Sequence, residues 1–299
     1  MIAAILVLAL AGAQSDGTAG QHAERASALM QRGDLKNAET ELRKAVDLSP
    51  NDPALLTSLG GVLGMEGDLR DANVFFAKAV KLRPDDSLLR RNLAANEWQL
   101  GRFREAHENL NRLLHSNPHD KVAIFLMGMV CENERDYACS VKRLESIPDV
   151  VQHQPEALVA LASSYYHVGR RNDGESALNA VLSRDVKPQV AFMAGRVAMD
   201  AHEFGLAERL FSTAAPGYSD RGISAQLALA QYRQGRAGDA EKTLVDAVDA
   251  KRANADAYVL LCKLMGDRGA YAKALEFAAG AARLFPDSPR FSRPRAHWK

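Results

Sequence analysis

Small residues recur along the chain at a fixed interval, and apolar residues with helical spacing surround them. One series of small residues has successive spacings of 34, 34, 34, 34, 33, 33 and 34: Ala38, Ala72, Ala106, Ser140, Gly174, Ala207, Ala240 and Ala274. A second series runs twelve residues earlier: Ala26, Gly60, Ala94, Gly128, Ala162, Gly195, Ala228 and Cys262. Because two helices approach closely only where side chains are small, these positions predict the contact points of helix pairs.

Larger apolar side chains, glycines and prolines keep the same register. Four residues after the first series come Leu42, Phe76, Leu110, Leu144, Leu178, Phe211 and Leu244. Between the two halves of most units stands a glycine: Gly33, Gly67, Gly101, Gly169, Gly235 and Gly269. Glycine lets a chain leave a helix in a left-handed conformation, and proline interrupts helices. Each unit is therefore predicted to be a helix, a tight turn, a second helix and a loop.

The sequence departs from this pattern at three kinds of position. Arg135 and His202 replace the turn glycine, and Arg171 replaces an apolar residue. The pair Ile147-Pro148 comes early, so we expect the second helix of the fourth unit to end short.

The second unit shows most plainly what the repeat resembles. It reads Leu59-Gly60-x2-Leu63, then Gly67, Ala72-x3-Phe76, Ala79 and Pro84. This resembles the tetratricopeptide repeat, a unit of 34 residues. The resemblance implies an all-α, right-handed superhelical solenoid of about eight antiparallel helix pairs, of the exported bacterial type. The repeats are expected to cover residues 19–288, starting near 19, 53, 87, 121, 155, 188, 221 and 255.

Composition and motifs narrow the function. The 299 residues carry 38 Lys+Arg against 37 Asp+Glu, so a net charge of +1 provides no electrostatic reason to bind nucleic acid. The chain has no H-E-x-x-H, G-x-S-x-G, P-loop or G-x-G-x-x-G motif. We therefore expect a protein that is not an enzyme and uses no cofactor.

The first thirteen residues form an uncharged apolar run that ends in Ala11-Gly12-Ala13. A small-residue end of this kind suits signal peptidase, and the run is too short for an ordinary membrane-spanning helix. No Lys or Arg precedes Arg25, although signal peptides usually begin with a positive region. The expectation is a signal peptide and short leader over 1–18, export to the periplasm or outside, and no stable membrane span.

In tetratricopeptide proteins the first helix of each repeat lines a concave groove that binds peptides of partner proteins. The resemblance implies these groove residues: Arg91, Asn92, Trp98, Phe125, Met129, Tyr166, Phe192, Arg196, Met199 and Tyr232. Exposed aromatic side chains and arginines often anchor partners; the alternative is that several of them pack between repeats. The charged clamp with which some relatives hold a C-terminal carboxylate is not reproduced, since Ala23, Ser27 and Ser58 occupy its places. A non-catalytic scaffold or adaptor is expected, binding a helix or extended segment of a protein partner.

Two clusters of reactive side chains have simpler interpretations. His115, His119 and Asp120 could ligate a metal ion, but a solvated loop between repeats explains them, and no metal site is predicted. Cys131 and Cys139 lie on the two helices of the fourth repeat. We expect two packed small side chains there, and a disulfide is the alternative if the protein is exported.

Residues 289–299 form a basic tail that follows the last predicted helix. That helix carries Leu275, Ala278 and Ala282 and would leave an apolar flank open. The ends of a solenoid need covering, so a second hypothesis is a structural or assembly factor of the cell envelope that associates with itself through the C-terminal helix. A frayed, solvated tail is the alternative.

Overall fold

The computed structural model describes residues 17–218 and 222–292, and within these ranges all regular structure is helical, with no strand. The apolar run before Ala13 and the basic end of the tail, 293–299, lie outside the described residues. By its internal contacts the chain divides into two compact units, Met1–Val150 (unit 1) and Val151–Lys299 (unit 2). The all-α prediction is confirmed.

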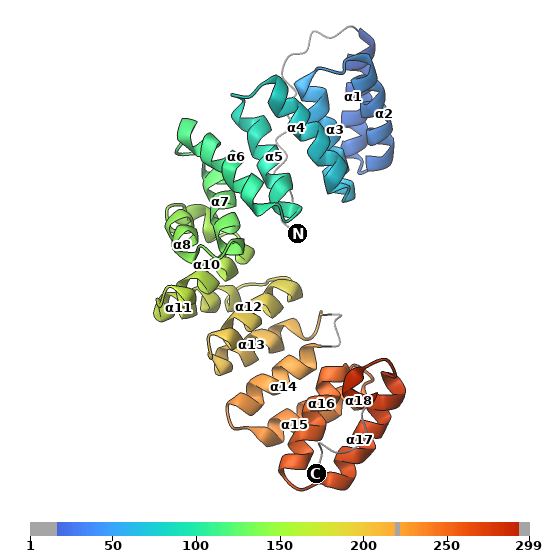
Figure 1. Cartoon of the computed structure of the whole chain (residues 1–299), viewed down its shortest axis with the longest axis vertical. Helices are drawn as coiled ribbons and strands as arrows, with labels where there is room; N and C mark the ends of the chain where they lie inside the picture. Colours follow the sequence, from blue (N-terminus) through green and yellow to red (C-terminus); the bar gives the residue numbers. More distant parts are fainter. Residues whose placement is uncertain (1–16, 219–221, 293–299) are drawn as a thin grey trace. The chain divides into compact units, whose positions relative to one another are not determined.

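Unit 1 is a stack of four antiparallel helix pairs, drawn from blue to green in Figure 1. Its helices are α1 (Gly17–Gln31), α2 (Leu35–Leu48), α3 (Pro53–Glu66), α4 (Leu69–Leu82), α5 (Ser87–Gln99), α6 (Phe103–Ser116), α7 (Lys121–Asn133) and α8 (Tyr137–Glu145). The second helix of each of the first three pairs also contacts the first helix of the next pair. The stack therefore buries one continuous core, as repeat proteins do.

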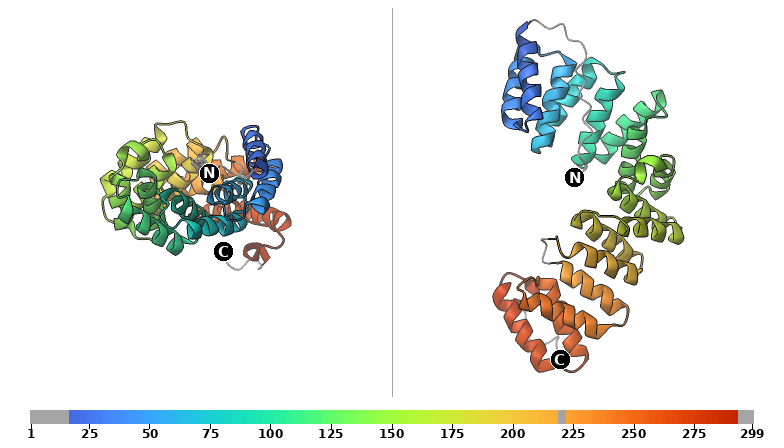
Figure 2. Two further views of the ribbon diagram at one scale, coloured as in Figure 1. Left: turned by 90° about the horizontal axis from the view of Figure 1, so that it is seen from above. Right: turned by 180° about the vertical axis from the view of Figure 1, so that it is seen from behind.

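Unit 2 repeats the arrangement and is drawn from yellow-green to red. Its helices are α10 (Pro155–His167), α11 (Arg171–Leu182), α12 (Pro188–Asp200), α13 (Phe204–Ala214), α14 (Ile223–Arg233), α15 (Ala237–Asp249), α16 (Ala255–Asp267), α17 (Tyr271–Leu284) and the short α18 (Pro289–Ser292). Figure 2 shows from behind how the helices of each unit lie in successive pairs. The short helix α9 (Pro148–Val151) lies at the division between the units.

Aspartates fix where many of the helices begin. The carboxylates of Asp52, Asp86 and Asp120 each accept two backbone N–H groups from the first turn of α3, α5 and α7. The first N–H groups of a helix have no partner within it, so such a cap is worth about 1 kcal/mol. These aspartates lie 34 residues apart, which sets the starts of α3, α5 and α7 at the repeat interval.

The turns inside the pairs have the predicted conformation. All six predicted turn glycines have φ between 74° and 95°. Arg135 (φ 64°) and His202 (φ 62°) adopt the same left-handed conformation at the two departures, at the steric cost that a side chain brings there. The turn geometry is therefore kept even where glycine is not.

The small residues lie where the paired helices come closest. A Cβ atom built on Gly60 would lie 3.0 Å from the Phe76 ring, and one on Gly128 would lie 2.6 Å from Leu144. In unit 2, a Cβ on Gly195 would lie 2.6 Å from the ring of Phe211. In each case the large residue is sixteen positions later, on the second helix of the same pair. Small residues therefore set the spacing of the pairs.

The end of unit 1 departs from regularity as the sequence predicted. Helix α8 has 9 residues, whereas the other second helices of unit 1 have 14. It ends just before Ile147, which is buried, and Pro148, which begins α9. The chain divides into its two units at this interruption.

Candidate functional site

The expected groove residues of unit 1 lie on α5 and α7, and α5 contacts both α3 and α7. We call the residues Arg91, Asn92, Trp98, Phe125 and Met129 the first-helix surface of unit 1. The other five predicted residues lie in unit 2 and are described separately.

Arg91 is engaged in an ion pair. Its guanidinium lies 3.2 Å from the Asp120 carboxylate, which also accepts the backbone N–H groups of Val122 and Ala123 at 3.0 Å. Both side chains are largely buried. Arg91 therefore ties α5 to the start of α7, and its positive charge is already balanced.

Asn92 differs from its neighbours because it is buried and lacks a partner. The residue is 6% exposed, and its amide nitrogen Nδ2 is buried with no hydrogen-bond partner. An unsatisfied buried donor costs about 1–3 kcal/mol, so such groups are rare in folded proteins. Further along the same helix, Asn96 donates to the Leu69 carbonyl oxygen and to Asn73. Of these two buried asparagines on α5, Asn96 has hydrogen-bond partners for its amide nitrogen and Asn92 does not.

The remaining residues of this surface are less open than the sequence suggested. Phe125 is 7% and Met129 is 8% exposed, so both side chains are buried. Trp98 is half-buried, and its indole Nε1 donates to Asn133 Oδ1 at 2.7 Å. Phe125 and Met129 are therefore too buried to form the exposed aromatic surface that was expected, whereas Trp98 is partly accessible.

Two aromatic residues of unit 2 also prove to be packing residues. The Tyr166 ring lies over Gly174, on the second helix of its own pair, where an added Cβ would be 2.9 Å from it. Phe192 stacks on Tyr218 with ring centroids 4.5 Å apart and lies 5.6 Å from Phe211. Both aromatic side chains therefore take part in helix packing, as the alternative expected, and both residues are half-buried.

The other three predicted residues of unit 2 are accessible to different degrees. Arg196 is exposed, and Met199 and Tyr232 are half-buried. The Lys263 ammonium lies 5.5 Å above the Tyr232 ring, on the first helix of the next pair. A cation over an aromatic face is attractive, so Tyr232 contributes to the joining of consecutive repeats.

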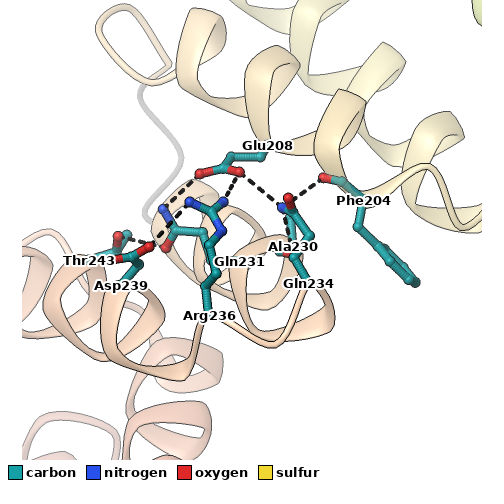
Figure 3. A network of polar contacts seen from close by, with 8 residues as sticks. All are labelled: Phe204, Glu208, Ala230, Gln231, Gln234, Arg236, Asp239 and Thr243. Carbon is teal, nitrogen blue, oxygen red and sulfur yellow. Dashed lines mark hydrogen bonds and ion pairs between the residues drawn. The ribbon is translucent and has the colours of Figure 1, made fainter.

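A polar network that the sequence analysis did not single out joins α13, α14 and α15 (Figure 3). Glu208 accepts hydrogen bonds from Gln231 and Gln234 and pairs with Arg236. Partial burial acts to raise the pKa of Glu208, but these hydrogen bonds and the arginine outweigh it and lower the pKa. The network stabilises the contact between two repeats.

The sequence contained a signal for such networks. Gln231 lies at the position that holds Leu63 and Met265 in other repeats, so a polar residue stands there in place of an apolar one. Glu97 has the same position in unit 1, is 6% exposed and accepts a hydrogen bond from Asn109 at 2.8 Å. Burial raises the pKa of Glu97.

The two cysteines of the fourth pair form a disulfide, which corrects the expectation of two unbridged side chains. Cys131 in α7 and Cys139 in α8 are bonded, with their Cα atoms 5.8 Å apart. That separation lies within the range of about 4.4–6.8 Å that disulfides require. Cys262 is a free thiol in the core, and burial raises its pKa to about 11.

The histidine loop has a structural role at one of its positions. Asp120 caps α7 and pairs with Arg91, whereas His115 and His119 are exposed. Within residues 17–218 and 222–292, no three His, Cys, Asp or Glu side chains are placed to share a metal ion. In the same part of the chain, no helix is long and apolar enough to cross a membrane.

Comparisons with known proteins agree with this geometry. Three family models described as tetratricopeptide repeat match residues 22–52, 65–127 and 226–289. Together they cover about half of the chain, and their matches lie in both units. No curated protein sequence matches the chain.

Several solved structures share the fold. A tetratricopeptide repeat protein from Parabacteroides merdae superposes with a TM-score of 0.61 at 19% identity, covering 84% of this chain and 100% of its own. PilW, described as a widely conserved type IV pilus biogenesis factor, superposes with a TM-score of 0.59 at 16% identity, covering 72% of this chain and 99% of its own. MamA from Desulfovibrio magneticus superposes at 0.52 with 19% identity, covering 57% of this chain and 96% of its own.

Helix pairs whose spacing is set by small residues every 33 or 34 positions define an α-helical repeat protein. The chain belongs to the tetratricopeptide repeat family. Members of this family generally serve as scaffolds for protein–protein interaction, and this chain has the architecture of such a scaffold.

Proposed function

We propose that the protein binds an extended segment of a partner protein on the first helices of unit 1, at Asn92 of α5. The observation that supports this is the Asn92 amide, which is buried and has no hydrogen-bond partner. A peptide carbonyl oxygen is an acceptor that would complete it once the Asn92 side chain turns toward the surface of α5, and a bound segment in extended conformation has carbonyl groups to offer.

The charges and apolar groups nearby favour a neutral segment. Arg91 is balanced by Asp120, so its guanidinium is not free to select an acidic residue or a terminal carboxylate. Trp98, on the same helix as Asn92, is an apolar side chain that is half-buried. We therefore expect the segment to carry apolar side chains beside the carbonyl group that Asn92 binds.

A peptide selection tests the proposal. Peptides are selected from a displayed library on the wild-type protein and then measured against Asn92→Ala and the matched control Asn111→Ala. Asn111 is exposed on α6. One lost hydrogen bond predicts binding that is about 3- to 10-fold weaker for Asn92→Ala and unchanged for Asn111→Ala.

The unfolding temperature of Asn92→Ala shows whether weaker binding comes from a loss of stability. Because alanine removes an unsatisfied buried donor, Asn92→Ala should unfold at the same temperature as the wild type or higher. Peptides that bind Asn92→Ala and the wild type equally well would contradict the proposal, as would a selection that yields no binder.

We further propose that the protein is exported to the periplasm or outside the cell. The apolar run that ends at Ala13 and the disulfide of unit 1 support this, because disulfides persist in oxidising compartments. N-terminal sequencing of protein from a fractionated cell should find a mature start just after Ala13, in an extracytoplasmic fraction. Protein confined to the cytoplasm with its first residues intact would exclude export.

A second candidate function is self-association as a structural or assembly factor. It is favoured by α17, where Tyr271 is 51%, Leu275 43% and Leu284 62% exposed. Light scattering at high concentration should then show oligomers that Leu275→Lys disperses. A strict monomer in the wild type would remove this candidate.

A further inference from the structure

The two cysteines of the disulfide differ in their access to solvent. Cys131 lies near the end of α7 and is fully buried. Cys139 lies in the first turn of α8, is half-buried, and donates its backbone N–H to the capping carboxylate of Asp136. A reagent in solution therefore approaches Cys139 more readily than Cys131.

The position of Cys139 is unusual among the repeats. At the same place in their second helices, four other pairs carry an acidic residue in the first turn: Asp71, Glu105, Asp173 and Asp239. An acid there favours the helix through the partial positive charge of its N-terminus. Helix α8 has a cysteine in place of that acid, and it is also the shortest second helix of unit 1.

The disulfide closes a turn that is under strain and lies next to contacts between helices. The turn contains Arg135 in the left-handed conformation that glycine adopts in most other pairs. At the end of α7, Asn133 accepts from Trp98, and Glu134 follows it and pairs with His107. The bond therefore holds the end of α7 where that helix meets α5 and α6.

We propose that Cys131–Cys139 is a redox-responsive clasp on the last helix pair of unit 1, and that it exchanges with external thiols and disulfides through Cys139. In the oxidising direction, the Cys139 thiolate attacks one sulfur of an external disulfide, which forms a mixed disulfide and releases one thiolate. Cys131 then loses its proton and attacks the Cys139 sulfur, which closes the intrachain bond and releases the second external thiol. Two electrons pass from the protein thiols to the external disulfide, and reduction by a thiol follows the same steps in reverse.

Burial of Cys131 sets the rate of the exchange. Cys131 is fully buried, so its sulfur can react only with Cys139 inside the fold, both when the bond closes and when it reopens. The clasp should consequently form through an observable mixed disulfide at Cys139, and thiols should reopen it slowly by the same route.

The test uses the full chain with Cys262→Ala, a replacement that matches the alanines at the same position in other repeats. Glutathione disulfide is added to the folded Cys131→Ser and Cys139→Ser variants, and the addition of one glutathione is followed by intact mass. We expect Cys139, left free in Cys131→Ser, to be modified at least about 10-fold faster than Cys131 is in Cys139→Ser. In denaturant the two rates should converge, because the difference comes from folding.

Two further measurements keep the result clear if a variant folds poorly. With both cysteines present, the Cys262→Ala protein incubated with glutathione disulfide should contain no free thiol in denaturant, and its Tm should fall by about 5 °C on reduction. The chain has two tryptophans, and Trp298→Phe leaves Trp98 as the one that reports. In that variant, reduction should also change the fluorescence of Trp98. Two free thiols after oxidation, equal rates of modification in the folded variants, or an unchanged Tm with unchanged Trp98 fluorescence would each overturn the proposal.

Discussion

Gly128 illustrates how single residues set the geometry of this protein. A Cβ atom there would lie 2.6 Å from Leu144, closer than folded proteins allow, so the helices of the fourth pair can nest only with glycine at this point. Gly64, in α3, has open space around the place of its Cβ. Replacing each of these two glycines with alanine should therefore change the stability of the protein in opposite directions.

Gly128→Ala should destabilise the protein by about 1–3 kcal/mol, because the added methyl group overpacks the contact with Leu144. Gly64→Ala should stabilise it by about 0.5–1 kcal/mol, because alanine is the better helix former and meets nothing. Urea unfolding of both variants checks the pair. Equal effects of the two substitutions would mean that small residues do not set the helix spacing.

For single residues, the sequence predicted the contact positions better than the groove positions. The small positions were predictable, since their interval alone marks Gly60, Gly128 and Gly195 as contacts. Tyr166 and Phe192 were placed on the groove, but they pack against the second helix of their own pair. Adjacent helical positions differ by about 100° around the axis, so a small error in facing turns a surface residue into a packing residue.

At the scale of helices, polar networks supplement the apolar contacts between repeats. The lowered pKa of Glu208 has a consequence for stability. A carboxyl group whose folded pKa lies below its unfolded value stabilises the fold when ionised. That contribution is present above the unfolded pKa, near 4.5, and is lost as the pH falls through the lower folded pKa.

Glu208→Gln should therefore lower the free energy of unfolding by about 0.5–1 kcal/mol at pH 7, because it removes the ion pair with Arg236. The difference from the wild type should vanish as the pH falls well below 4.5. Asp246→Asn, at an exposed position of α15, is the control and should have little effect at either pH. A difference that persists unchanged at low pH would show that Glu208 does not act through its charge.

At the same scale, the disulfide between α7 and α8 could not be predicted from the sequence alone. Two cysteines eight residues apart are compatible with bridged and unbridged states, and the outcome depends on the turn between α7 and α8. Arg135 adopts the left-handed turn that glycine provides elsewhere, and the two Cα atoms come within 5.8 Å. The sequence showed the missing glycine and not the conformation that Arg135 would take.

At the scale of the whole molecule, the chain is a tetratricopeptide scaffold of two compact units. In both units, small residues at a fixed interval lie where the paired helices come closest. The family and the all-α architecture could be predicted from the repeat interval, because that interval reflects a packing requirement. The candidate site could be predicted only in part. Asn92 was expected on the binding face, but its missing hydrogen-bond partner depends on every neighbour in the fold.

The most direct test of the proposed function follows the Asn92 side chain itself. In a ¹⁵N-labelled protein, the side-chain NH2 signals of Asn92 are assigned by their loss in Asn92→Ala and then followed as a selected peptide is added. The account predicts that these signals shift on binding, while those of the exposed Asn111 stay in place. Saturating peptide that leaves the Asn92 signals unmoved would contradict it.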